Sequence, residues 1–86
     1  MAKIEIYTSP FCGFCHRAKT LLAAKGVEFE EIDTFMASDK RAEMSARAGG
    51  RTSVPQVFVD GAHLGDSDEL QAMEAEGVLD AKLGLA

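Results

Sequence analysis

The chain has 86 residues, of which 47% are hydrophobic and 27% charged, a composition typical of one globular domain with a hydrophobic core. It contains no apolar run of about 20 residues, the length that spans a bilayer, and residues 1–10 lack the apolar stretch of a signal peptide. The formal net charge of −5 argues against a general affinity for nucleic acid. We therefore expect a single cytoplasmic domain, residues 1–86, that binds neither nucleic acid nor membranes.

The predicted elements, in chain order, are a strand, a helix, a strand, a helix, two strands and a helix. Alternating apolar residues indicate the strands, and apolar residues that recur every three or four positions indicate the helices. The first two strands must be parallel and joined by a right-handed crossover, and the last two form a hairpin in the same sheet. This order, βαβαββα, predicts an α/β fold. The elements span residues 3–7, 13–25, 27–32, 39–48, 56–60, 62–64 and 66–76.

Turn and capping residues indicate where these elements begin and end. Gly26 and Gly77 are placed to end the first and last helices, and Ser38 is placed to cap the second. The pair Asp60-Gly61 is typical of a hairpin turn. The acidic run 66–69 suits the start of a helix, because negative charge is stabilised at the positive end of the helix dipole.

Cys12 and Cys15 lie where the first strand passes into the first helix. Residues three apart share one face of a helix, so the two sulfurs can close a disulfide. Cys12, at the helix start, also faces unpaired backbone N–H groups, which favour the ionised and reactive form of its sulfur. Cys15 lies one turn deeper and is expected to stay protonated until it attacks. We interpret Cys12 as the nucleophile and Cys15 as the resolving thiol.

The Cys-x-x-Cys spacing also occurs in zinc sites and, where histidine follows as His16 does here, in covalent haem attachment. A structural zinc site needs four ligands, but the chain has no third cysteine, and its other histidine, His63, lies 48 residues beyond Cys15. Haem attachment normally accompanies export, and an inert structural pair is unusual in a reducing compartment. A redox couple is the reading that these features favour.

A second motif, Arg51-Thr-Ser-Val-Pro55, leads into the third predicted strand. Proline is tolerated at the first position of a strand, and the Val54–Pro55 bond is a candidate for the cis isomer. A cis bond would turn the N–H and C=O of Val54 toward a peptide-like partner; the alternative is a proline that merely begins the strand. Basic residues are concentrated between positions 17 and 51. They form either an ordinary solvated surface or a locally basic region that can receive a small anion.

Taken together, these motifs resemble the glutaredoxins over nearly the whole chain, most closely the short bacterial dithiol members. The matching segments are Tyr7-Thr8, Cys12-x-x-Cys15 followed by His-Arg-Ala-Lys, Arg51 to Gly61, and Gly65-x-Ser67-Asp68-Glu69-Leu70. The resemblance implies a thioredoxin-like fold, with a four-stranded mixed sheet flanked by helices and a cis Val54–Pro55 bond. It also implies reduction of protein disulfides and glutathione mixed disulfides at the expense of glutathione.

The resemblance further implies where glutathione binds. The main chain of Val54 would pair with the cysteine residue of the tripeptide, and Phe14 would line the groove. The backbone N–H groups of Ser67 and Asp68 would take the γ-glutamyl carboxylate, and the Asp68 side chain would face the ammonium group. Arg51, and less directly Arg41, would meet the glycyl carboxylate. The residues implied in glutathione binding are Phe14, Arg41, Arg51, Ser53, Val54, Pro55, Ser67 and Asp68.

Three features depart from the usual family pattern. Ser9 stands where many relatives have lysine, and Asp66 replaces a glycine, which adds negative charge beside an anionic ligand. Gly13-Phe14 replaces Pro-Tyr and resembles the centre of glutaredoxins that carry iron–sulfur clusters. One alternative is therefore a dimer in which Cys12 from two subunits and two glutathiones ligate a [2Fe–2S] cluster; another is a redoxin served by thioredoxin reductase, which would need no γ-glutamyl pocket. The expected form is a monomer without a resident metal.

Overall fold

The computed structural model describes residues 2–85 and contains the predicted succession of strands and helices. β1 pairs in parallel with β2 and antiparallel with β3, and β3 pairs with β4, so the order across the sheet is β2-β1-β3-β4. The predicted parallel pair and hairpin are therefore confirmed. The elements are β1 (Ile4–Thr8), α1 (Gly13–Ala24), β2 (Glu30–Asp33), α2 (Ser38–Arg47), β3 (Gln56–Val59), β4 (Ala62–Gly65), α3 (Ser67–Glu76) and α4 (Leu79–Lys82).

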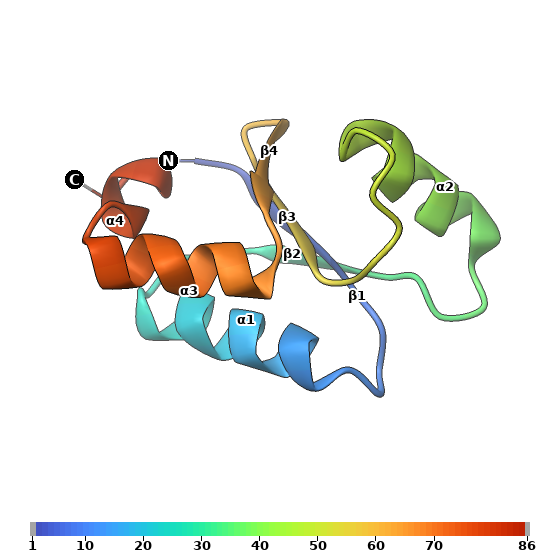
Figure 1. Cartoon of the computed structure of the whole chain (residues 1–86), viewed down its shortest axis with the longest axis horizontal. Helices are drawn as coiled ribbons and strands as arrows, with labels where there is room; N and C mark the ends of the chain where they lie inside the picture. Colours follow the sequence, from blue (N-terminus) through green and yellow to red (C-terminus); the bar gives the residue numbers. More distant parts are fainter. Residues whose placement is uncertain (1, 86) are drawn as a thin grey trace.

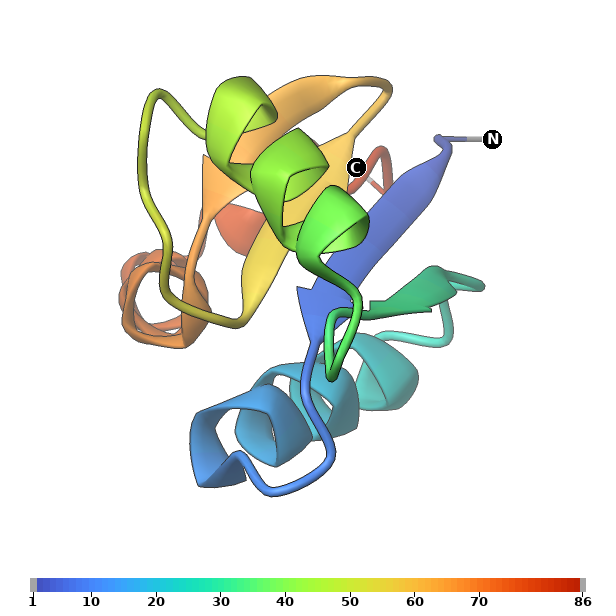
Figure 2. The same cartoon turned by 90° about the vertical axis from the view of Figure 1, so that its right-hand side faces the viewer.

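Helices cover both faces of the sheet. α1 and α3 lie together on one face, and α2 lies alone on the other (Figure 1, Figure 2). All five residues of β1 are buried, because this strand is internal to the sheet and covered on both sides. The core under α1, α3 and α4 contains Ile4, Ile6, Ala18, Leu22, Val57, Leu70, Leu79 and Leu83, and the core under α2 contains Tyr7, Met44, Ala48 and Phe58.

The core under α2 also holds an ion pair. Arg47 Nη2 lies 2.8 Å from Glu5 Oε1, and Arg47 Nη1 donates to the Tyr7 hydroxyl at 2.7 Å. The guanidinium carbon of Arg47 lies 4.2 Å from the centre of the Phe58 ring. The hydrogen bond from Arg47 lowers the pKa of Glu5 despite its burial. This pairing lets a carboxylate occupy the middle of the sheet, where an unpaired charge is costly.

The second strand and second helix start at residues other than those predicted. The strand begins at Glu30 rather than at residue 27, since its pairing with β1 starts at Glu5↔Glu30. Val27 and Phe29 alternate in the sequence, but they pack against the edge of the core without joining the sheet. Ser38 is the first residue of α2 and not its N-cap; Ala37 occupies the cap without a side-chain hydrogen bond.

The C-terminal segment contains a helix that the sequence analysis does not predict. Gly77 ends α3 with a left-handed backbone (φ 77°), as expected, and α4 follows two residues later. Four residues are too short to give a helical periodicity, and α4 is held by the burial of Leu79 and Leu83 against the sheet. None of the helices within residues 2–85 has the length and apolar content of a membrane-crossing segment.

Candidate functional site

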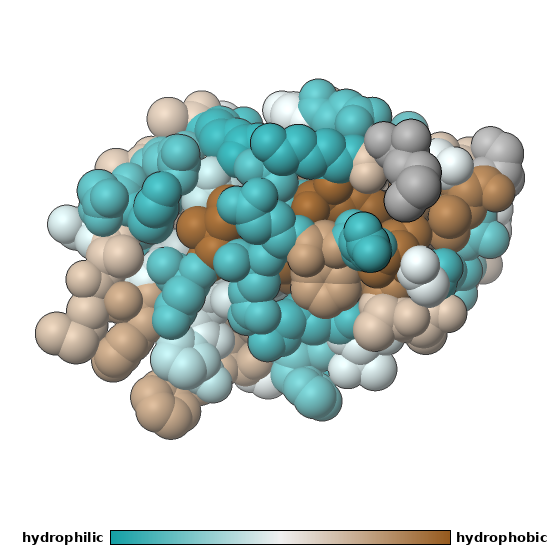
Figure 3. Space-filling view, turned by 180° about the vertical axis from the view of Figure 1, so that it is seen from behind, coloured by the Kyte–Doolittle hydropathy of each residue, from teal (hydrophilic) through white to brown (hydrophobic). Residues whose placement is uncertain are grey.

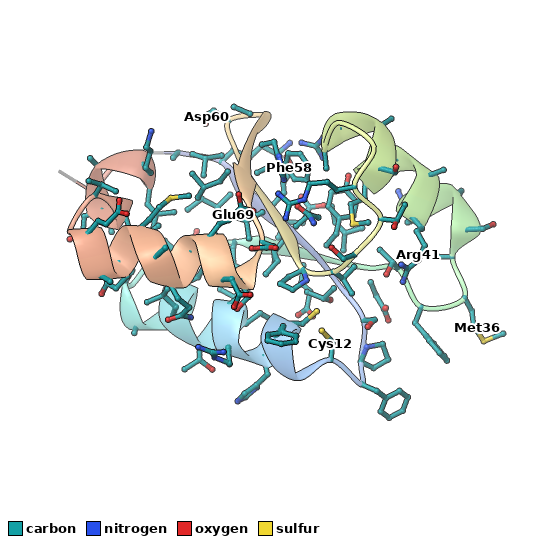
Figure 4. All side chains as sticks on the ribbon, in the orientation of Figure 1. Cys12, Met36, Arg41, Phe58, Asp60 and Glu69 are labelled. Carbon is teal, nitrogen blue, oxygen red and sulfur yellow. The ribbon has the colours of Figure 1, made fainter. Side chains whose placement is uncertain are left out.

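Cys12 is the N-cap residue of α1, and its sulfur accepts a hydrogen bond from the first turn. The Cys15 N–H donates to Cys12 Sγ at 3.2 Å, the contact that a serine or aspartate side chain usually makes at this position. An ionised sulfur accepts such a bond more strongly than a thiol does. Both cysteines are free thiols, and Cys12 is partly exposed to solvent. Figure 4 shows Cys12 at the start of α1, below the loop that leads into β3.

Cys15 differs sharply from Cys12 in its surroundings. It is 1% exposed, on the face of α1 that packs against the sheet. Burial, followed by a hydrogen bond with Cys12, raises the pKa of the Cys15 thiol to about 12. The direction of this shift favours the protonated form of Cys15, in line with the prediction from its depth in the helix.

The loop before β3 faces the exposed sulfur. The Cys12 thiol donates to the carbonyl oxygen of Val54 at 3.7 Å, across 42 residues of sequence. The Val54–Pro55 peptide bond is cis, as predicted. Gln56, which is buried, donates through Nε2 to the carbonyl oxygen of Ser53 at 3.1 Å. These contacts hold the backbone on either side of Val54 close to Cys12.

A cavity of about 190 Å³ adjoins Cys12 between α1, this loop and the start of α3. Six of the predicted glutathione-binding residues line it together with Asp66. Ser67 is 2% exposed, and its hydroxyl oxygen has no hydrogen-bond partner among the described residues. A buried polar atom without a partner at a helix N-terminus is suited to an anionic ligand. The lining residues are Phe14, Ser53, Val54, Pro55, Asp66, Ser67 and Asp68.

Asp66 organises the start of α3 in a way that the sequence analysis missed. Its side chain accepts from the Glu69 N–H at 2.9 Å, and Glu69 Oε1 accepts from the Asp66 N–H at 3.0 Å. Arg51 donates to both carboxylates, at 2.7 Å to Asp66 and 2.6 Å to Glu69. The Asp-x-x-Glu spacing is a recognisable capping-box signal, but nothing local in the sequence links these acids to Arg51.

The two predicted arginines do not line the cavity. Arg51 is engaged by the acids at the start of α3. Arg41 donates to the Thr52 carbonyl oxygen at 2.9 Å and to Thr34 Oγ1 at 3.2 Å, so it braces the loop before β3 against the end of β2 (Figure 4). A direct contact of either arginine with glutathione stays a prediction.

A larger cavity, of about 560 Å³, lies at the opposite end of β1 from the cysteines. It is lined by residues 2–4, 26–30 and 83–85. In the view from behind, strongly apolar residues gather on the side of the molecule where α4 and the start of β1 lie (Figure 3). Because β1 leads from this cavity to the loop that carries Cys12, the cavity takes no part in chemistry at the sulfur.

One copy of the chain brings together few side chains that could ligate a metal ion. Within residues 2–85, no group of three or more His, Cys, Asp and Glu side chains is placed to hold a metal ion. Cys12 is the accessible sulfur of the pair, so an iron–sulfur cluster would take its other ligands from a second chain and from glutathione. That alternative stays a prediction.

Comparison with known proteins identifies a family for this chain. The family model described as Glutaredoxin matches residues 4–64. Glutaredoxin 3 of Escherichia coli K12 is 51% identical over 83 residues, which are 96% of this chain and 99% of that protein. The glutaredoxin of Pseudomonas aeruginosa is 46% identical, over 96% of this chain and 98% of that protein.

Solved structures with the same fold are also glutaredoxins. The solution structure of the Brucella melitensis glutaredoxin has a TM-score of 0.83 and 48% identity, covering 96% of this chain and 89% of that one. A buckwheat glutaredoxin–glutathione complex has a TM-score of 0.83 and 28% identity, covering 96% of this chain and 77% of that one. The predicted thioredoxin-like fold is thereby confirmed. The chain belongs to the glutaredoxin family and is a glutathione-dependent thiol–disulfide oxidoreductase.

Proposed function

We propose that Cys12 is the nucleophile with which this oxidoreductase reduces protein disulfides and glutathione mixed disulfides, and that Cys15 is its resolving thiol. The observation that carries the proposal is the position of the Cys12 sulfur. It lies 3.2 Å from the Cys15 nitrogen and 3.7 Å from the Val54 carbonyl oxygen, beside a cavity of about 190 Å³. The Cys12 sulfur thus lies close to both a backbone hydrogen-bond donor and the backbone of Val54, which supports the proposal.

Glutathione would occupy that cavity with its cysteine sulfur toward Cys12. A peptide can pair its main chain with an exposed backbone edge such as Val54. The N-terminus of α3 and the buried Ser67 hydroxyl would receive the γ-glutamyl carboxylate. Phe14, which is more than half exposed, would cover the apolar part of the tripeptide. These assignments rest on the lining of the cavity and on the family pattern.

The reaction consists of thiolate–disulfide exchanges that transfer two electrons in total. With a glutathione mixed disulfide, the Cys12 thiolate attacks the glutathione sulfur, the S–S bond breaks, and the protein leaves as a thiolate. A second glutathione thiolate then attacks the glutathione sulfur that is bound to Cys12, which forms glutathione disulfide and releases Cys12 as a thiolate. With a protein disulfide, the Cys12 thiolate first attacks one protein sulfur, which forms a mixed disulfide and releases the other protein sulfur as a thiolate. Cys15 then loses its proton and attacks the Cys12 sulfur, which releases the second protein thiolate and leaves a Cys12–Cys15 bond. Two glutathiones reduce that bond.

The surroundings of Cys15 suggest how resolution is timed. The hydrogen bond with Cys12 and the charge of Cys12 both raise the pKa of Cys15, after burial as the largest cause. When Cys12 joins a mixed disulfide, its sulfur can no longer ionise, so no charge on Cys12 opposes the ionisation of Cys15. Cys15 therefore becomes easier to ionise when its attack is required.

Serine substitutions separate the two roles. Serine is a good N-cap, so Cys12→Ser retains the start of α1 and should abolish turnover of both a glutathionylated peptide and a protein disulfide. Cys15→Ser should keep turnover of the glutathionylated peptide and lose reduction of the protein disulfide. Equal loss of both activities in the two variants would contradict these roles. Coupling the wild type to glutathione with glutathione reductase, and separately to thioredoxin reductase, tests the choice of electron donor.

We also propose that the protein acts as a monomer in the cytoplasm. The proposed site is built from one chain, and free thiols are maintained in a reducing compartment. Its protein partners would be those that carry disulfides or glutathionylated cysteines. Sedimentation of the reduced protein with and without glutathione tests whether the protein is a monomer. A dimer that forms only with glutathione would favour the cluster-bridged form.

A further inference from the structure

Three large apolar side chains, one of which directly precedes Cys12 in the sequence, are exposed outside the proposed glutathione cavity. Phe11, the residue before Cys12, is 91% exposed, and Phe35 and Met36 are 51% and 91% exposed. None of the three lines the cavity beside Cys12. We call these three residues the apolar rim. In the view from behind, apolar atoms project at the end of the molecule where α2 and the loop before α1 lie (Figure 3).

The apolar rim is one surface, although it comes from two segments. The rings of Phe11 and Phe35 are packed edge to face, with their centroids 6.2 Å apart. Met36 follows Phe35 and points away from the body of the protein (Figure 4). Aromatic pairs of this geometry attract each other beyond their buried area. The loop that carries Cys12 is thus tied to the turn that follows β2.

That turn is held rigidly against the end of β1. Thr34 donates to the Thr8 carbonyl oxygen through both its backbone N–H and its hydroxyl, each at 2.8 Å. The Phe35 N–H donates to Asp33 Oδ1 at 2.8 Å. Met36 has a left-handed backbone (φ 54°), a conformation that a residue with a long side chain adopts only at a cost. These hydrogen bonds hold the backbone that leads to Phe35 and Met36 against the end of β1.

The identity of the partner follows from the position of the apolar rim. Any disulfide that reacts with Cys12 must bring its own sulfur into contact with the Cys12 sulfur, so the protein around that disulfide covers the residues next to Cys12. A small glutathione disulfide can be held by the cavity alone. Exposed aromatic and methionine side chains contribute strongly when an apolar partner covers them.

From these observations we infer that the apolar rim docks protein substrates that carry a bulky apolar side chain beside the reactive cysteine. The inference rests on the proposed function and names a substrate class for the same site. The apolar rim makes the enzyme select among protein disulfides and leaves small glutathione disulfides unaffected.

The test compares three probes at equal concentration of glutathione. Two are synthetic peptides with one internal disulfide that differ only in a Phe or a Ser next to the first cysteine, and the third is the cysteine–glutathione disulfide. The variants are Phe11→Ser, Met36→Asn and the double variant. Leu85→Ser is the matched control, because it removes an exposed apolar side chain at the end of the chain that lines the remote cavity.

We expect the wild type to prefer the Phe peptide, and the double variant to lose about tenfold in kcat/KM on that peptide. For the double variant, turnover of the Ser peptide and of the cysteine–glutathione disulfide should stay within about twofold of the wild-type values. The control variant should resemble the wild type on all three probes. Equal kcat/KM of the wild type on the two peptides, or equal losses of the double variant on all three probes, would overturn the docking role. Absence of wild-type turnover of the cysteine–glutathione disulfide would overturn the proposed function itself.

Discussion

Replacement of Asp66 by asparagine should strengthen the binding of glutathione. Asp66 lines the cavity beside Cys12, and glutathione carries two carboxylates and one ammonium group, so its net charge is negative. Asparagine keeps an oxygen that accepts the Glu69 N–H and is as good an N-cap as aspartate, so the start of α3 should be preserved. The variant removes a negative charge with little change of shape.

The size of the effect follows from the width of the cavity. A volume of about 190 Å³ corresponds to a width of roughly 6 Å. Two like charges at that distance repel each other by about 0.7 kcal/mol in water and about 3 kcal/mol at the effective dielectric constant of a protein surface. Arg51 lies 2.7 Å from Asp66 and offsets part of this repulsion. About 1 kcal/mol remains, which corresponds to about a fivefold lower KM for glutathione.

The assay is the KM for glutathione in reduction of the cysteine–glutathione disulfide, measured at low and high ionic strength. The difference between Asp66→Asn and the wild type should shrink in about 1 M salt, where the Debye length is about 3 Å. Glu76→Gln is the control, because it changes the net charge equally at the far, exposed end of α3. An unchanged KM in Asp66→Asn at low salt, or an equal decrease in the control, would refute the reasoning.

Two further predictions concern stability. Burial raises the pKa of Cys15 from 9.0 to about 12, so the folded state holds a proton that the unfolded state has lost between those values. The free energy of unfolding of the reduced protein should therefore fall by up to about 1.4 kcal/mol per pH unit above pH 9, in urea titrations at pH 8 to 10. Cys15→Ala should weaken this dependence, and the same slope in both proteins would contradict the assignment. Arg47→Met should lower the free energy of unfolding at pH 7 by about 3 kcal/mol, because it leaves the buried Glu5 carboxylate without its partner. Adding Glu5→Gln to that variant should restore part of the loss, and a further decrease in the double variant would argue against a paired charge. Arg47 lowers the pKa of Glu5. The contribution of this ion pair to the free energy of unfolding should therefore be present above about pH 4.3 and be lost as the pH falls further.

Local patterns in the sequence determined the order of the elements and the place of the redox pair. Alternation and helical periodicity depend only on neighbouring residues, so they gave the β1–α1–β2 crossover and the hairpin correctly. The position of Cys12 at a strand–helix junction follows from the same patterns, and so does the burial of Cys15 one turn later. Even the cis Val54–Pro55 bond was indicated by its motif.

The tertiary structure decided everything that depends on how distant segments meet. Val27 and Phe29 alternate like a strand, but where β2 begins is set by its register with β1. The resemblance implies that Arg51 meets the glycyl carboxylate of glutathione, yet its side chain reaches two acids 15 and 18 residues further along. The contact of Phe11 with Phe35 is likewise absent from any local pattern. The attraction between charges in solution and between apolar groups weakens over short distances. Only the folded arrangement of the chain therefore determines which of its charges and rings come close enough to attract each other.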